Sequence, residues 1–273
     1  MKVLIAGSNG YIGCHVTQMF AKSSHDVFIY CRDNCIKSYS GEHQKHSSEL
    51  EGYFDVVINC ARPHWSQYSA KNIADIESKL LARLDKLASQ QAMKIHTSGV
   101  WLFGHATPSE LVRFQLKPFD SVRLDVATIN TALNNNWHIV YCPSLVYGGE
   151  NCQLLRITET LPNQTMLVAV PTQGFNQYIH VNDIAKFYRL LVSTRTEEKQ
   201  HFIAESIGYS PEEFSMLLLN FSFVKKVSRI HWEDFERING TGAVEIEKLH
   251  LELPISPLFK ATESVQNYVE NHT

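Results

Sequence analysis

The chain has 273 residues, of which 44% are hydrophobic, so it can bury one large core or a main domain with a small second one. Its 25 basic and 28 acidic side chains are mixed along the sequence and give a net charge of -3, which predicts no nucleic-acid partner. No apolar stretch of about 18 residues and no secretory signal occurs. We therefore expect a cytoplasmic protein that has no membrane partner.

The cysteines and histidines do not follow a metal-binding pattern. The six cysteines are scattered without a CxxC pair, and the thirteen histidines lack an HExxH spacing. The sequence therefore predicts free thiols and no metal site.

Residues 2–31 have the pattern of a strand, a glycine turn, a helix and a second strand. Residues 3–6 and 27–30 are continuous apolar runs, and apolar residues recur at helical spacing between positions 12 and 20. Continuous apolar strands are typical of a parallel sheet that is covered on both faces by helices. This segment predicts a βαβ unit.

The next segments continue the alternation of strands and helices. The polar segment 33–52 predicts only a short helix or strand. Later elements are expected at 54–60 (strand), 69–91 (helix), 94–97 (strand), 120–135 (helix) and 137–142 (strand). The helix 69–91 is predicted to bury one apolar face, made of Ile73, Ile76, Leu80, Leu84 and Leu87. This order of elements predicts an α/β fold with a doubly wound parallel sheet, the Rossmann fold.

After Pro143 the elements become shorter. Apolar pieces lie at 165–170, 178–181 and 200–204, and helices are predicted near 183–193 and 210–219. We therefore expect a main domain at 1–150, completed by about 174–205. Residues 151–273 are expected to form a small α/β cap interleaved with that domain.

The stretch GSNGYIG at 7–13 lies between the first predicted strand and the first helix. Glycines allow the backbone to approach a pyrophosphate closely, and the N-terminus of the helix offers free N–H groups to the anion. The context predicts a dinucleotide site in domain 1–150, whereas the alternative is a tight turn needed only for packing. The predicted contacts are Gly7, Ser8, Asn9, Gly10, Tyr11, Ile12 and Gly13.

The end of the second strand distinguishes NADP from NAD. A carboxylate at this position accepts hydrogen bonds from the ribose hydroxyls of NAD, but this chain has Cys31 and Arg32 there. A guanidinium can bind a 2'-phosphate through two hydrogen bonds, so NADP is favoured over NAD. In the alternative interpretation, Arg32 is a solvated charge and Asp33 binds the ribose.

Several motifs together resemble the extended and atypical short-chain dehydrogenase/reductases, also called the NAD-dependent epimerase/dehydratase family. The matching segments are GSNGYIG at 7–13, NCA at 59–61, TSGVWLFG at 97–104, PSLVYG at 143–148 and YIHVNDIA at 178–185. The resemblance covers most of the chain. It implies that Cys60, Ala61 and Pro143 also contact the cofactor, and that residues 151–273 bind a small-molecule substrate.

The resemblance fails at the catalytic motif. Family members use a Ser or Thr with a Tyr and a Lys spaced as YxxxK, in which the phenol transfers a proton and the lysine lowers the phenol's pKa. Here Phe119 stands at the tyrosine position and Arg123 at the lysine position. A phenyl ring cannot transfer a proton. The chain therefore resembles an atypical subgroup that lacks the YxxxK motif.

The resemblance implies Ser98 as the active-site hydroxyl, with Thr97 as the alternative, and Arg123 as the remaining positive charge. Tyr147 is the first candidate for a replacement proton donor because its motif lies beside the cofactor in relatives. Other candidates are Tyr178, His180, His105 and His64. His180 belongs to a motif in which it and Asp183 can instead cap the N-terminus of the following helix.

The predicted function is that of an NADP-dependent oxidoreductase or epimerase-like enzyme. It would act on a small carbonyl or hydroxyl compound, because few basic residues are placed to bind a nucleotide-sugar diphosphate. The alternative function is that of a non-catalytic NADP-binding sensor or regulatory protein, motivated by Phe119 and Arg123. The resemblance also allows a homodimer through the helices at 69–91 and 120–135.

Overall fold

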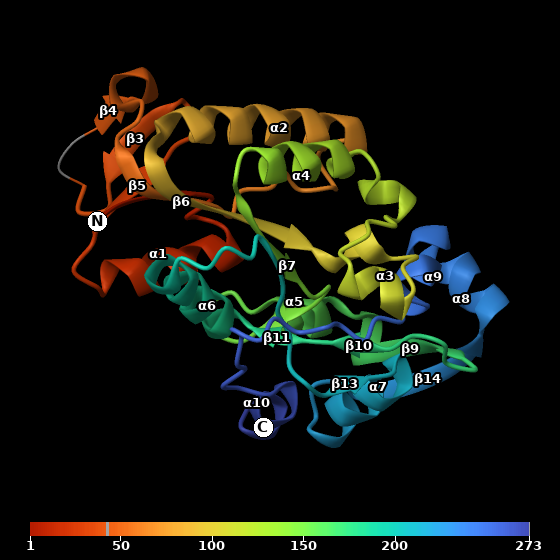
Figure 1. Cartoon of the computed structure of the whole chain (residues 1–273). Helices are drawn as coiled ribbons and strands as arrows, with labels where there is room; N and C mark the ends of the chain where they lie inside the picture. The colour runs from red at the N-terminus through yellow and green to blue at the C-terminus, as the bar shows by residue number, and fades with distance from the viewer. Residues whose placement is uncertain (42–43, 273) are drawn as a thin grey trace. The chain divides into compact units, whose positions relative to one another are not determined.

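Eight strands form one sheet in the computed structural model, which describes residues 1–41 and 44–272 (Figure 1). Their order is β12-β7-β6-β5-β1-β2-β3-β4. The bounds are β1 Lys2–Ala6, β2 Asp26–Tyr30, β3 Cys35–Ser38, β4 Gln44–His46, β5 Phe54–Asn59, β6 Ala88–Gly99, β7 His138–Cys142 and β12 Gln200–Phe202. Strand β1 is parallel to both β2 and β5, and β5 is parallel to β6. The predicted α/β class with a largely parallel sheet is confirmed.

The edge of the sheet beyond β2 is built by an antiparallel hairpin. Strand β3 runs antiparallel to β2 and pairs with antiparallel β4, and a short 3-10 helix, η1 Ser47–Leu50, follows. Only residues 31–34 separate β2 from β3, whereas a parallel crossover needs about a dozen residues or more. The polar segment 33–52 therefore contains two strands, more than we predicted. Residues 42 and 43 of that segment lie outside the described residues.

Helix α2 (Ala70–Leu87) buries part of the face that we predicted, namely Ile73, Leu84 and Leu87. Its buried residues are Ile73, Ala74, Glu77, Leu81, Leu84 and Leu87, whereas Ile76 is exposed. Ser69 caps the helix by accepting a hydrogen bond from the Asn72 backbone N–H at 3.3 Å. Glu77 is buried among these apolar residues and has ionic partners that are described below.

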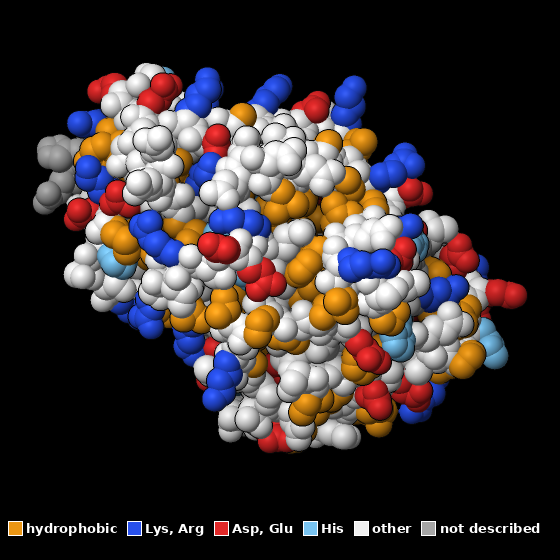
Figure 2. Space-filling view, in the orientation of Figure 1, with side chains coloured by type: hydrophobic (Ala, Val, Ile, Leu, Met, Phe, Trp, Pro, Cys, Tyr) orange, Lys and Arg blue, Asp and Glu red, His pale blue; other side chains and the backbone are white. Residues whose placement is uncertain are grey.

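The described chain divides into two compact units, each built from several stretches of sequence. The first unit contains residues 1–99, 120–141 and 184–201, and the second contains 100–119, 142–183 and 202–273, of which Thr273 is not described. Segment 100–119 therefore lies in the second unit, although we expected it in the main domain. No helix of the described residues is both long and apolar enough to cross a bilayer. Figure 2 shows basic and acidic side chains interspersed over the face it displays.

The first unit carries three complete helices besides the sheet strands and η1. They are α1 Tyr11–Ala21, α2 and α4 Asp125–Asn134, preceded by the 3-10 helix η3 Asp120–Val122. Most of α6 (Val181–Thr194) also belongs to this unit. The predicted helix at 120–135 is therefore confirmed from residue 125 onward, and its beginning is a 3-10 turn.

The second unit is made of short elements around its own core. These are η2 Val100–Phe103, α3 Pro108–Val112, β8 Val146–Tyr147, α5 Gln153–Thr160, η4 Pro162–Gln164, β9 Thr165–Val170, β10 Asn176–Gln177, β11 Ile179–His180, β13 Gly208–Tyr209, α7 Pro211–Asn220, β14 Lys226–His231, α8 Trp232–Asn239, α9 Thr241–Glu247 and α10 Val265–Glu270. Strand β9 pairs in parallel with β14, and Tyr147 and Phe214 lie in a shared hydrophobic cluster. Helix α7 begins with a capping box formed by Ser210 and Glu213.

Two buried carboxylates hold the C-terminal segment of the second unit. Glu205 accepts the Val265 backbone N–H with both oxygens, at 3.0 and 3.1 Å. Asp183 accepts the backbone N–H groups of Thr262 and Glu263 at 2.8 and 3.2 Å. Burial raises the pKa of Glu205 to about 7, although the bond from Val265 opposes this shift.

The raised pKa of Glu205 predicts a pH-dependent stability. Unfolded, this carboxyl ionises near its ordinary pKa, so between about pH 4.5 and 7 the folded state retains a proton that the unfolded state has lost. Stability therefore falls as pH rises through this window, by up to about 3 kcal/mol. Glu205→Gln removes this titration while keeping an acceptor for Val265. We expect its unfolding midpoint relative to wild type to be higher at pH 8 than at pH 5, whereas a constant difference would contradict the assignment.

Candidate functional site

The glycine loop lies at the carboxyl end of β1, where it closely approaches the chain that follows β5. Gly7 has φ +83°, and a Cβ there would lie 2.5 Å from the Ala61 backbone nitrogen. A Cβ on Gly13 would fall on the carbonyl oxygen of Gly7. These two glycines are therefore required by packing within the protein itself, as in the packing alternative for this loop.

Gly10 is different because its environment does not explain it fully. A Cβ there would meet only the Gly7 carbonyl oxygen, at 3.2 Å. Gly10 is also the N-cap of α1, which has no side-chain cap and no acidic residue in its first turn. The first N–H groups of a helix have no acceptor within the helix, so this end favours an anion. Ser8 is buried and Asn9 is exposed beside it.

The hairpin turn between β2 and β3 places Arg32 and Asp33 differently. The Asp33 carboxylate accepts the Cys35 backbone N–H at 3.2 Å, so it is engaged in its own turn. Arg32 is exposed and forms no ion pair or hydrogen bond within the described part of the chain. Of the two, Arg32 has the side chain that is free to bind a ligand.

Hydroxyl and thiol groups meet at the carboxyl ends of β5 and β6. The Thr97 hydroxyl lies 2.7 Å from the Tyr188 hydroxyl and donates a hydrogen bond to the Cys60 sulfur at 3.4 Å. Burial raises the pKa of Cys60 to about 12, so this thiol stays protonated. Ser98 is half-buried, and its hydroxyl has no hydrogen-bond partner among the residues described. Ser98 is thus more available to a ligand than the alternative, Thr97.

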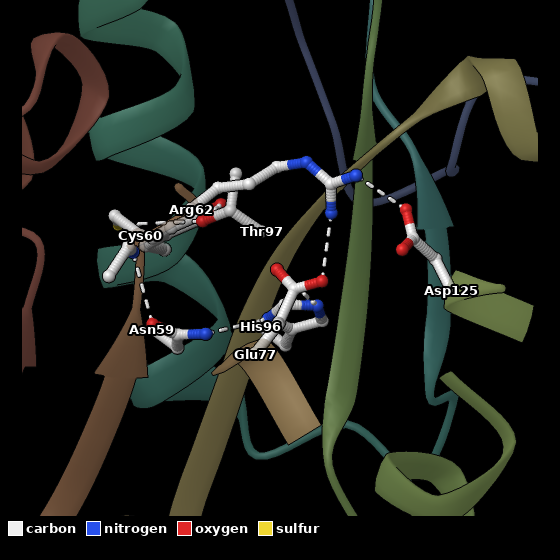
Figure 3. A network of polar contacts seen from close by, with 9 residues as sticks. Asn59, Cys60, Arg62, Glu77, His96, Thr97 and Asp125 are labelled. Carbon is white, nitrogen blue, oxygen red and sulfur yellow. Dashed lines mark hydrogen bonds and ion pairs between the residues drawn. The ribbon is translucent and has the colours of Figure 1, made fainter. Parts of the chain in front are cut away.

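An ionic network supports the segment after β5 (Figure 3). The Arg62 guanidinium donates to Glu77 of α2 at 2.8 Å and to Asp125 of α4 at 2.5 Å. Glu77 also lies 3.9 Å from His96 Nε2, and His96 Nδ1 lies 3.1 Å from the Asn59 amide nitrogen. This network joins two helices to the ends of two parallel strands.

The side-chain amide of Asn59 connects the network to the segment that packs against the glycine loop. Asn59 Oδ1 accepts the Ala61 backbone N–H at 3.0 Å, and Ala61 is the residue that Gly7 approaches. Burial, together with the Arg62 charge, lowers the pKa of His96 to about 3, so His96 is neutral. Its Nδ1 accepts from the Asn59 amide, which leaves the proton on Nε2, facing Glu77. The network thus fixes the position of the Ala61 backbone.

The sequence analysis did not identify Arg62, Glu77, His96 or Asp125. A signal was present, because Glu77 is four residues from Ile73 and from Leu81 and so occupies the centre of an otherwise apolar helix face. A carboxylate at such a position needs a cationic partner. Nothing in the spacing of residues identifies Arg62 as that partner.

Phe119 and Arg123 lie in different environments. The Phe119 ring is buried in the second unit, where its atoms fill the space that a side chain on Gly104 would need. Arg123 belongs to the first unit, its side chain is 72% exposed, and it pairs only weakly with Asp120 at 3.7 Å. The structure gives Phe119 a packing role, and it leaves Arg123 accessible to a ligand.

Tyr147 does not have the environment of a proton donor. It is fully buried in the hydrophobic core of the second unit, and burial, reinforced by nearby Glu205, raises its pKa. Burial likewise raises the pKa of the enclosed Tyr178. His180 Nδ1 accepts the Asn182 backbone N–H at 3.2 Å, a bond that fits a role at the start of α6. Pro143 also belongs to the second unit.

The remaining histidine candidates pack against aromatic neighbours. His105 makes an edge contact with the Phe119 ring at 5.1 Å, and His64 stacks on Trp65 at 5.4 Å. His64 Nδ1 also lies 2.6 Å from the Ser66 hydroxyl. Neither histidine is accompanied by a carboxylate that would orient it as a general acid. Among the residues described, no group of three or more metal-ligating side chains is present.

Comparison with solved structures identifies the fold. The chain superposes on UDP-glucose 4-epimerase from Thermotoga maritima, solved with UDP-glucose, at 14% identity and a TM-score of 0.71, covering 99% of this chain and 96% of that one. Human epimerase family protein SDR39U1, solved with NADPH, is 13% identical and superposes with a TM-score of 0.72, covering 99% of this chain and 98% of that one. dTDP-4-dehydrorhamnose reductase from Bacillus anthracis, solved with NADP, is 14% identical and superposes with a TM-score of 0.72, covering 99% of this chain and 97% of that one.

These comparisons confirm that the chain has the fold that these three proteins share. No protein-family model matches the sequence, and no curated protein matches it. At identities of this size the likeness establishes the fold alone, and the residues must support any function.

The ionic network predicts a large effect of Arg62→Met on stability. The variant leaves the Glu77 carboxylate buried without its cation, which we expect to cost about 2 to 4 kcal/mol at pH 7.5. Burial already raises the pKa of Glu77, and loss of Arg62 raises it further, so the cost should shrink as pH falls toward 5. Urea unfolding at both pH values measures this difference.

Two further variants control for the loss of an arginine. Arg123→Met removes a mostly exposed arginine, and we expect a change below about 0.5 kcal/mol. Adding Glu77→Gln to Arg62→Met should recover part of the lost stability, because the unpaired charge is then gone. Equal losses for Arg62→Met and Arg123→Met would show that the network contributes nothing specific.

Proposed function

We propose that this chain is an NADP-dependent oxidoreductase or epimerase-like enzyme of the epimerase/dehydratase family, with a non-standard active site. The observation that carries the proposal is the N-terminus of α1 behind Gly10, which has no side-chain cap and no acidic residue in its first turn. Structures of the same fold contain NADPH or NADP, among them human SDR39U1 and the Bacillus anthracis reductase. The pyrophosphate would lie on the loop at 7–13.

The chain's own residues distribute the remaining cofactor contacts. Arg32 would bind the 2'-phosphate because it is exposed and unpaired, whereas Asp33 is engaged by Cys35. Cys60 and Ala61 would border the adenosine ribose, in a segment held by Asn59. Arg32 follows β2 and Cys60 follows β5, and both strands pair in parallel with β1. Ligands of open α/β sheets bind at the carboxyl ends of such strands.

At the reacting end, Ser98 and Arg123 are the groups that we assign. A bound nicotinamide supplies hydride transfer, which requires orientation of the substrate carbon more than protein chemistry. The unpaired Ser98 hydroxyl can donate a hydrogen bond to a substrate oxygen, and Arg123 can supply a positive charge. The substrate class remains a small carbonyl or hydroxyl compound. Tyr147 is not retained as the proton donor, because its phenol is buried and its pKa is raised.

A second candidate function is NADP binding without turnover, as in a sensor or regulatory protein. The observation that favours it is Phe119, which is buried at the position of the family's tyrosine and cannot transfer a proton. The cofactor loop is the same under both proposals. Only activity measurements distinguish them.

Arg32→Gln tests the choice of cofactor. We expect wild type to bind NADPH more tightly than NADH, and Arg32→Gln to lose about tenfold or more in NADPH affinity with NADH unchanged, because a charge-assisted hydrogen bond to the phosphate is lost. Lys37→Gln is the matched control, since Lys37 is an exposed cation of the neighbouring strand β3. Calorimetric titration measures both affinities. Failure of wild type to bind either cofactor would show that the glycine turn is structural.

Ser98→Ala tests the catalytic assignment against a panel of aldehydes, ketones and nucleotide sugars. For any substrate that wild type turns over with NADPH, we expect kcat to fall about 100-fold, because a hydrogen bond to the reacting oxygen is lost. Thr97→Val is the matched variant, and a larger effect there would move the role to Thr97. Absence of turnover together with saturable NADPH binding would refute the enzyme proposal and support the sensor.

A further inference from the structure

A basic hollow lies in the first unit, away from the glycine loop. It has a volume of about 130 Å³ and opens at the amino-terminal ends of β7 and β12, beside residues 91–94 of β6. A space of this size can hold one small anion. Lys94, Arg195 and Lys199 all line it, and it contains no acidic residue.

The two lysines are held in position by neighbouring acceptors. Lys94 Nζ donates to Asp85 Oδ1 at 2.6 Å and to the Asn135 carbonyl oxygen at 2.5 Å. Lys199 Nζ lies 3.1 Å from His138 Nε2, which accepts one of its three protons. Each ammonium therefore has at least one proton left for a ligand, and neither has to be ordered when the ligand binds.

The positive charge of the hollow is only partly balanced. Asp85 neutralises Lys94, but neither Arg195 nor Lys199 has an ion pair within the described residues. Burial lowers the pKa of Lys199, Glu197 opposes this shift, and Lys94 adds a smaller lowering effect. An anion in the hollow would favour the charged form of Lys199.

Arg195 occupies a backbone position that usually belongs to glycine. It follows α6 with φ +48°, in the left-handed region, and donates its N–H to the Leu191 carbonyl oxygen at 3.0 Å. Glycine is preferred at this position of a helix end because a side chain there is strained. Arg195 lines the hollow from this position, beside the two lysines.

Two stacked histidines adjoin the hollow, and one of them, His138, lines it. His138 and His201 lie with parallel rings at 5.7 Å, and His138 Nδ1 faces His201 Nε2 at 3.4 Å. Since His138 Nε2 accepts from Lys199, its proton is on Nδ1, directed at His201. A ligand that binds Lys199 is therefore expected to alter the hydrogen bonding of both imidazoles. Their ring signals provide a local readout that the glycine loop does not disturb.

We propose that this hollow binds a phosphoryl group, either as free inorganic phosphate or as the phosphate of a small phosphomonoester. Lys94 of β6 and the pair Arg195 and Lys199 of the connection at 195–199 supply three cationic groups, which suit the several oxygens of a tetrahedral dianion better than a single carboxylate. Asn136 and Thr196 add uncharged donors at the rim. The site is independent of the proposed cofactor site, because it shares no residue with it.

The test follows the imidazole nitrogen signals of His138 and His201 by NMR while inorganic phosphate is added at constant ionic strength. We expect a saturable shift with phosphate and none with chloride. Lys199→Met should weaken phosphate binding about tenfold or more, whereas Lys71→Met, which removes an exposed lysine of α2, should leave it unchanged. A second titration with adenosine 5'-monophosphate identifies the source: a saturable shift indicates a phosphomonoester, and its absence indicates free phosphate.

Arg195→Gly separates a binding role from a structural one. Glycine relieves the backbone strain, so we expect a higher unfolding midpoint, together with weaker phosphate binding. A structural role for the arginine would instead lower the midpoint. The proposal is overturned if chloride reproduces the shifts, if they rise linearly without saturation, or if Lys199→Met binds phosphate as wild type does.

Discussion

The candidate site depends on one close approach between two pieces of backbone. The chain leaving β1 at Gly7 packs against the chain leaving β5 at Ala61, and no Cβ fits between them. Gly13 then packs on the Gly7 carbonyl, which brings the first turn of α1 to the same edge of the sheet. The helix N-terminus and the ends of two parallel strands are thereby gathered at one place. Gly10 remains open there to a ligand.

The ion pairs of Arg62 stabilise the segment at Ala61 that Gly7 approaches. Arg62 ties the segment to α2 and α4, while Asn59, oriented by neutral His96, accepts the Ala61 N–H. A buried carboxylate such as Glu77 is costly by itself and becomes tolerable through its cation. Such a network restrains geometry more than it adds stability, because desolvation offsets most of the Coulomb attraction. It fixes the backbone that a dinucleotide would contact.

The chemistry at the other end of the site is less complete. Phe119 fills space in the second unit, and Tyr147 is enclosed by the core of that unit beside Glu205. Ser98 and Arg123 of the first unit remain accessible. The chain therefore keeps groups that can hold and polarise a ligand, but it lacks the phenol that ordinarily transfers the proton. This combination is compatible with slow or unusual chemistry and with binding alone.

The sequence by itself determined the class of fold, because continuous apolar strands, helical periodicity and a glycine turn are local signals that act over a few residues. It also located the loop at 7–13 and the absence of a tyrosine at Phe119. Only the tertiary structure decided that β3 forms a hairpin, that Glu77 faces inward, that Arg62 is its partner and that Tyr147 is buried. These features depend on residues far apart in the chain, whose meeting no local periodicity specifies.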